Sequence, residues 1–226
     1  IPAPRQSVWR RERGHAATEI RPAGLFLSPR KGWSERGQSR LRPDPHVVIK
    51  GKGRDVLPEL IPYDRQAAVH YAHQWAFSRN PKYFDFETIG GDCTNFASQC
   101  LYQGSGVMNF TPDFGWYYID ASRKAPAWTG VPYFYNFMTR TQKSPGPVGV
   151  AASLDMLLPG DFVQLRFAYD TFGHTPIIVE VGNPPTLDNI LVAAHSQDAD
   201  FRPLSTYFFQ EIRFLHILGS RPPSVG

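Results

Sequence analysis

The chain has 226 residues, with 24 Lys and Arg against 20 Asp and Glu, so its formal net charge is +4. The hydrophobic content of 42% and aromatic content of 14% exclude a wholly disordered protein. No run approaches the roughly 18 apolar residues of a membrane helix, so we expect a soluble chain. The charge is unevenly divided: residues 1–56 hold 13 basic and 5 acidic side chains, and residues 57–226 hold 11 and 15.

Residues 1–56 are expected to form a basic, mostly irregular arm or linker, with a short helix near 8–13 and an extended piece near 47–50. Basic character favours contact with nucleic acid or an acidic envelope polymer. A solvated linker is the preferred interpretation, because aromatics are few and no binding-module pattern is present. Pro2, Pro4 and Arg5 interrupt the first apolar residues, so no signal peptide is visible. The chain begins with Ile1, as a processed product or fragment would, and the compartment stays open, secretion or envelope association included.

The domain is expected to span residues 57–226 and to begin with a helix over 63–79, with Asp64 near its start and Asn80-Pro81 as its stop. His70 and His73 are spaced to share a metal, but no third ligand matches, so they are assigned to the polar face. A second helix is expected over 93–103, ending at Gly104.

Residues 105–150 are rich in Gly, Pro and aromatics, and a short helix is expected over 131–140. Such loops wrap a core or line a cleft. Trp116 and Trp128 are therefore weak candidates for substrate-contacting cleft walls, with core packing preferred for both. Strands are expected at 161–167, 175–181, 189–196 and 215–219, which gives an α+β fold with an antiparallel sheet.

The two cysteines, Cys93 and Cys100, lie seven residues apart on the second expected helix. Helical rise separates their Cα atoms by roughly 10 Å, beyond the roughly 7 Å limit for a disulfide. Both are therefore expected to be free thiols. Cys100 lies on the apolar face and is expected to be inert.

The segment from Gly90 to Phe96, GGDCTNF, carries the chemistry. Two glycines relax the backbone, Asp92 is expected to cap the helix with Asn95 in a supporting role, and Cys93 falls in the first turn. Unpaired N–H groups and the helix dipole there favour thiolate over thiol. The sequence therefore predicts a nucleophilic cysteine.

A thiol nucleophile requires a base, and His174 stands where a loop becomes a strand. If strands 175–181 and 189–196 form a hairpin, opposed residues sum to about 371, and His195 becomes the diagonal neighbour of His174. A different register would leave Gln197 or Asp198 as the orienting group, and a slip of one residue would turn His195 to the other face.

Two other site chemistries fit the residues less well. Cys93, His174 and His195 could form a zinc set, although the carboxylate motif of the zinc deaminases is absent. Asp85 and Glu87 lie too close in a loop to act as a glycosidase pair. No nucleotide-binding loop is present, and neither a cofactor nor a metal is expected.

Six segments together resemble the bacterial putative amidase-domain family, which is similar to the NlpC-like and CHAP branches of the papain-like cysteine peptidases. They are the segment of residues 63–110 that contains GGDCTNF, then GWYY, PAWTGVPYFYNFM, LLPGDFVQL, FGHTPIIVEV and NILVAAHSQDADFRPLSTY. The likeness runs from about Tyr63 to Gly219. It implies a papain-like core, with a cysteine at a helix start packed on an antiparallel sheet.

By this resemblance Cys93 is the nucleophile, His174 the general base and His195 the third polar residue. The implied reaction is amide hydrolysis through an acyl-enzyme, on peptidoglycan stem peptides or a related envelope substrate. The residues leave two alternatives open, a non-catalytic cell-wall-binding module and acyl transfer to an amine. No nucleic acid is expected to bind the catalytic domain, and the oligomeric state is not readable from the sequence.

Overall fold

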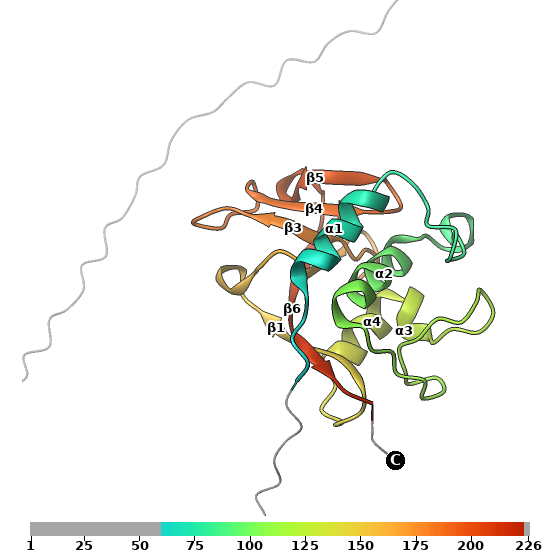
Figure 1. The fold of residues 1–226 in the computed structure, drawn as a ribbon. Coiled ribbons are helices and arrows are strands. Elements are labelled where there is room, and N and C mark those ends of the chain that lie inside the picture. The colour runs from blue at the N-terminus through green and yellow to red at the C-terminus, as the bar shows by residue number, and fades with distance from the viewer. Residues whose placement is uncertain (1–59, 224–226) are drawn as a thin grey trace, which may run out of the picture. The chain divides into compact units, whose positions relative to one another are not determined.

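The computed structural model describes residues 60–223, so the helix and the extended piece expected within residues 1–56 lie outside the described part (Figure 1). The fold is α+β, with four α-helices packed on a sheet of six strands. The helices are α1 (Arg65–Trp75), α2 (Cys93–Ser105), α3 (Pro126–Thr129) and α4 (Val131–Met138). None of the described helices is long and apolar enough to cross a membrane.

All strand pairs of the sheet are antiparallel, in the order β1-β6-β2-β3-β4-β5. The strands are β1 (Gly146–Ala152), β2 (Phe162–Arg166), β3 (Ile177–Val181), β4 (Ile190–Ala194), β5 (Ala199–Pro203) and β6 (Glu211–Arg221). Short 3₁₀ turns lie at Glu87–Ile89, Leu154–Met156 and Leu204–Thr206. The expected α+β class and antiparallel sheet are confirmed.

The helix ends follow local chemistry. Asp64 caps α1 as expected, because its Oδ1 accepts the backbone N–H of Ala67 at 2.9 Å. Helix α2 starts at Cys93 and continues two residues past the expected stop, to a left-handed cap at Gly106 (φ 65°). Gly104 serves close packing instead, since a Cβ there would collide with the ring of Tyr63 and the carbonyl of Asp64.

Each face of the sheet carries its own core. Helices α1 to α4 cover one face, which we call the helix face, and α2, α3 and α4 lie together beside the sheet in Figure 1. The opposite face is packed by the 3₁₀ turns at Leu154–Met156 and Leu204–Thr206 and by Tyr207. The side chains alternate along β2, with Phe162 in the first core and Val163 and Leu165 in the second, as expected for a strand buried on both faces.

Strands β1 and β5 were not predicted. Strand β1 reads GPVGVAA, with two glycines and a proline, and β5 reads ADFRP, with two charged residues. Both are edge strands, where a sequence need not show the apolar pattern of a strand flanked on both sides. The predicted strand at 215–219 is part of the longer β6.

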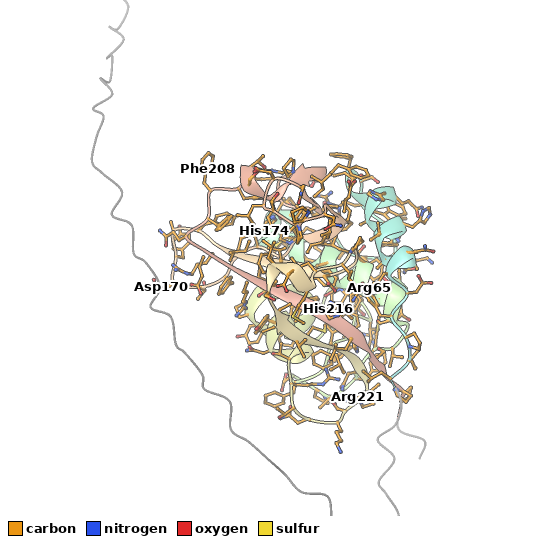
Figure 2. The ribbon with its side chains drawn as sticks, turned by 90° about the vertical axis from the view of Figure 1, so that its left-hand side faces the viewer. Arg65, Asp170, His174, Phe208, His216 and Arg221 are labelled. Atoms are coloured by element: carbon orange, nitrogen blue, oxygen red, sulfur yellow. The ribbon has the colours of Figure 1, made fainter. Side chains whose placement is uncertain are left out.

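A buried carboxylate fastens α1 to the sheet. The Oδ1 atom of Asp161 accepts Arg65 Nη1 at 2.7 Å and the Ile217 N–H at 3.0 Å, and its Oδ2 lies 2.7 Å from His216 Nδ1. Arg65 and His216 lie side by side in Figure 2. At the open end of β6, Ile61 and Ser220 exchange two backbone hydrogen bonds of 2.8 and 2.9 Å.

Candidate active site

Cys93 is the first residue of α2, and both glycines of its motif have left-handed φ angles, 105° at Gly90 and 99° at Gly91. The side chain is buried, with 7% of Cys93 exposed. Its Sγ lies 3.8 Å from Thr94 Oγ1 and 4.0 Å from the carbonyl oxygen of Gly173. The thiol therefore lies against the main chain that flanks His174.

Burial raises the pKa of the Cys93 thiol, and hydrogen bonds from the main chain of Thr175 and from Thr94 oppose this rise. The expected thiolate preference at a helix start is therefore corrected, because desolvation outweighs the helix terminus at this depth. Cys100 is also free, as expected, and burial raises its pKa far more.

Asp92 does not cap α2 with its side chain. Its Oδ1 accepts the N–H of Phe86 at 2.9 Å and the Asn95 amide at 2.8 Å, and its Oδ2 lies 2.6 Å from His195 Nδ1. The capping expectation is corrected, although Asp92 and Asn95 do support the segment that precedes Cys93.

Arg79 lies at the centre of an acidic cluster beside this segment. It makes two bonds to Asp198, of 2.9 and 3.0 Å, and lies 3.5 Å from Asp85, 3.6 Å from Glu87 and 3.7 Å from Asp92. Asp85 and Glu87 therefore both lie beside the same cation, which agrees with their exclusion as a glycosidase pair. Sequence reasoning did not single out Arg79, which follows the end of α1 and carries no motif of its own.

His195 connects two helix ends. Its Nε2 donates to the carbonyl oxygen of Trp75, the last residue of α1, at 2.9 Å, and its Nδ1 faces Asp92, directly before α2. The ring stacks on Phe96, with 3.9 Å between centroids. Both ring nitrogens therefore face an oxygen atom, and the imidazole joins the end of α1 to the residue that precedes α2.

The structure does not bring His195 to His174. The β3–β4 register follows the predicted sum of 371 near the turn, at Glu180↔Leu191, and a bulge then shifts it by one, to Ile177↔Ala193. Continuing this register places Thr175, not His174, opposite His195. No hydrogen bond to His174 from His195, Gln197 or Asp198 occurs among residues 60–223.

The His174 ring lies among residues of the second core. His174 pairs with Leu165, and its ring centroid lies 5.6 Å from that of Tyr207 and 6.2 Å from that of Phe167. Only 5% of His174 is exposed, and its Nε2 is buried without a hydrogen-bond partner. Burial lowers the pKa of His174 to about 4, with a smaller contribution from Arg202. Figure 2 shows its position between Phe208 and His216.

Thr175 points the other way, toward α2. Its hydroxyl oxygen accepts from Thr94 Oγ1 at 3.1 Å and from Gln164 Nε2 at 3.2 Å. Gln164 Nε2 also donates to the carbonyl oxygen of Val131 at 2.8 Å. These buried polar contacts fix the main chain of Thr175 against the start of α2, so the Cys93 sulfur and the His174 backbone are held together.

Tyr207 is a site residue that sequence reasoning missed. It is 6% exposed, and its hydroxyl is buried without a hydrogen-bond partner. The guanidinium of Arg202 lies over the ring, 3.8 Å from its centroid. Burial raises the pKa of Tyr207; Arg202 opposes the rise and Cys93 adds to it. The one available signal was its place at the end of the LSTY segment.

The remaining candidates fall outside the site. Trp116 and Trp128 are fully buried and donate to Ser98 Oγ at 3.0 Å and Asn95 Oδ1 at 2.9 Å, so they are core residues and not cleft walls. Within residues 60–223 no three His, Cys, Asp or Glu side chains are grouped as metal ligands, so the Cys-His-His set is not assembled.

The candidate site thus consists of Cys93, buried at the start of α2, and His174, which precedes β3 and has a buried Nε2 without a hydrogen-bond partner. Residues 62–218 match the sequence model of the family described as "Putative amidase domain". The chain belongs to this family, as its resemblance implied.

A relative from Bacillus subtilis (strain 168), the uncharacterized protein YhbB, is 33% identical over 176 residues, which cover 73% of this chain and 53% of that protein. The chain thus spans about half the length of that relative. No solved structure matches.

Proposed function

We propose that the chain is a cysteine-dependent amide hydrolase that works through an acyl-enzyme on a peptide of the cell envelope. The proposal depends chiefly on the position of the Cys93 sulfur against the Gly173 carbonyl and Thr175 main chain. The residue between them, His174, has a buried nitrogen without a partner. Membership of an amidase-domain family supports the same reaction class.

In the proposed reaction the Cys93 sulfur attacks the amide carbonyl carbon while its proton passes to His174. The C–N bond then breaks as His174 returns the proton to the leaving amine, which leaves a thioester. Water attacks the thioester, His174 accepts its proton, and the Cys93 thiol is restored with release of the acid. The N–H of Cys93, which has no intrahelical acceptor, and the Tyr207 hydroxyl are the proposed donors to the substrate.

The resting state in this proposal is a neutral thiol beside a neutral imidazole. Burial opposes both charges of a thiolate–imidazolium pair, so the pair forms only as attack proceeds. No hydrogen bond joins Cys93 to the His174 ring within the described residues, and catalytic bonds of this kind often tighten only when substrate is bound. His195 acts in this scheme as a positioning residue, through Asp92.

A non-catalytic binding module is the second candidate, and the raised pKa of the Cys93 thiol favours it. Full-length protein incubated with peptidoglycan fragments and followed by intact mass distinguishes the two. The hydrolase should release cleaved peptide and gain a Cys93-linked acyl mass. The Cys93→Ala and His174→Asn variants should lose both signals, and Cys100→Ala should keep them. Cleavage that persists in Cys93→Ala would refute the thiol mechanism.

A further inference from the structure

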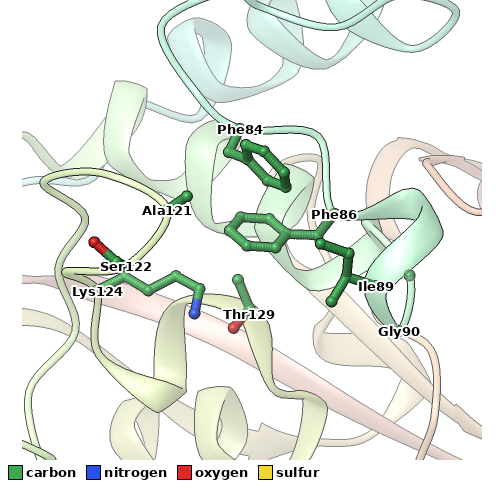
Figure 3. A pocket seen from close by; sticks show the side chains of 9 residues that line it. Phe84, Phe86, Ile89, Gly90, Ala121, Ser122, Lys124 and Thr129 are labelled. Carbon is green, nitrogen blue, oxygen red and sulfur yellow. The ribbon is translucent and has the colours of Figure 1, made fainter.

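A surface hollow borders the segment that leads into Cys93. It has a volume of about 410 Å³ and lies between the loop that carries Phe84, Phe86 and Ile89 and the loop that carries Ala121, Ser122 and Lys124 (Figure 3). Gly90 and Gly91 form part of its lining, so it reaches to within two residues of Cys93. A volume of this size is at the lower end of the roughly 300–1,000 Å³ typical of small-ligand sites.

The lining combines an exposed apolar wall with one charge. Phe84 is 43% and Ile89 is 67% exposed, and the rings of Phe84 and Phe86 contact each other edge to face, 4.9 Å between centroids. Of the nine lining residues, Lys124 alone is ionisable. Its ammonium lies 5.0 Å from the ring centroid of Phe86, and attraction to the ring face holds it over the hollow.

The Lys124 charge has no acidic partner within 4 Å among residues 60–223, and the nearby acids are engaged elsewhere. Asp120 lies 2.6 Å from Arg123, and Asp85 and Glu87 lie 3.5 and 3.6 Å from Arg79. A half-buried cation beside aromatic rings is less hydrated than one in bulk water, which strengthens its attraction to an anion. The hollow therefore matches an anion carried on an apolar stem.

We infer that this hollow is a subsite for a carboxylate of the peptide substrate, with Lys124 as its counter-charge and Phe84, Phe86 and Ile89 against the adjoining apolar group. The part of this inference that makes the bound peptide a substrate for cleavage rests on the proposed function. The carboxylate belongs either to an acidic side chain or to a peptide C-terminus, and the two share the same chemistry. Lys124 is then a specificity residue and takes no part in bond breaking.

Nuclear magnetic resonance titration of the full chain tests binding without turnover. The probes are acetyl-Phe-Glu-amide, acetyl-Phe-Gln with a free C-terminus and, as the neutral reference, acetyl-Phe-Gln-amide. At least one carboxylate probe should shift the Gly90 and Gly91 amide signals and bind about tenfold tighter than the neutral one. The carboxylate probe that binds more tightly shows whether the subsite takes an acidic side chain or a peptide C-terminus. Equal affinity for all three would overturn the subsite.

Lys124→Met retains length and apolar stem but removes the charge, so it should abolish this tenfold preference. Lys143→Met, at an exposed lysine outside the hollow, is the matched control and should keep it. A preference that survives in Lys124→Met would refute the role of Lys124. If the binding results hold while Cys93→Ala still cleaves peptides, the subsite stands and the thiol mechanism fails. If cleavage requires Cys93 but Lys124→Met keeps the tenfold preference, the thiol mechanism stands and the subsite fails.

Discussion

The Nδ1 atom of His195 lies 2.6 Å from the Oδ2 atom of Asp92, and both side chains are 1% exposed. Asp92 directly precedes Cys93, so this contact fixes the main chain from which the Cys93 side chain projects. His195 also binds the last carbonyl of α1, so one imidazole sets the spacing of two helix ends.

Breaking this pair should destabilise the domain. Asp92→Ala leaves His195 Nδ1, the Phe86 N–H and the Asn95 amide without their buried acceptor, and we expect the free energy of unfolding to fall by about 3–5 kcal/mol. Urea denaturation measures the change. Asp120→Asn, which removes an exposed partner of Arg123, should leave stability nearly unchanged, and an equal loss in both variants would contradict the special role of the buried pair.

The Cys93 thiol should react slowly at neutral pH. Because burial raises its pKa, the thiolate fraction at pH 7 is below that of a free cysteine, and alkylation by iodoacetamide should accelerate only as the pH rises past about 8.5. Peptide mass spectrometry of wild type and Cys100→Ala over pH 6–10 reports the rate at Cys93. Rapid labelling at pH 7 would show an activated thiolate instead.

His174 should destabilise the fold in acid. The pKa of His174 is about 4 in the folded state and 6.5 ordinarily. Between these pH values the unfolded chain therefore binds a proton at His174 and the folded chain does not. Its contribution to stability is intact above pH 6.5 and falls as the pH drops toward 4, by up to about 1.4 kcal/mol per pH unit.

His174→Asn cannot titrate, so its stability relative to wild type should improve steadily as the pH falls from 7 to 4.5. Urea titrations at several pH values measure the difference. His70→Asn, at an exposed histidine of α1, provides the control and should run parallel to wild type. A His174→Asn curve that also runs parallel would mean that the ring is not desolvated.

Tyr207→Phe should raise or maintain stability while lowering turnover. The variant deletes a buried hydroxyl without a hydrogen-bond partner, so the free energy of unfolding should rise by up to about 1 kcal/mol. It also removes the proposed donor to the substrate, so we expect turnover to fall at least tenfold.

Tyr71→Phe is the matched control for Tyr207→Phe, because the Tyr71 hydroxyl donates to Gln99 at 2.7 Å and accepts from Asn80 at 2.8 Å. The Tyr71→Phe variant should therefore lose about 1 kcal/mol of its free energy of unfolding. Thermal denaturation and turnover distinguish the two tyrosines, and full activity in Tyr207→Phe would exclude its hydroxyl from the reaction.

Local patterns predicted much of the fold. The helical spacing around Tyr71, the cap at Asp64 and the start of α2 at Cys93 all follow from neighbouring residues, and so do the four predicted strands. Edge strands β1 and β5 escaped prediction because their burial is decided by partners distant in sequence.

The site was harder to predict, for a physical reason. Its candidate residues were found from their types, but one bulge between Ile178 and Glu180 decides which face each histidine occupies. The depth of Cys93, which reverses the expected direction of its pKa shift, also depends on packing from Gly173 and Thr175. Neither the bulge nor the burial of Cys93 can be predicted from the neighbouring residues in the sequence.

The exchange of hydrogen bonds between Ile61 and Ser220 places the beginning of the described part of the domain next to the end of β6. A fold whose ends meet in this way can be spliced into a surface loop of another protein without stretching its host. The same feature permits circular permutation: a short linker could join the two ends, and new termini could open in the β3–β4 turn, far along the chain from Cys93.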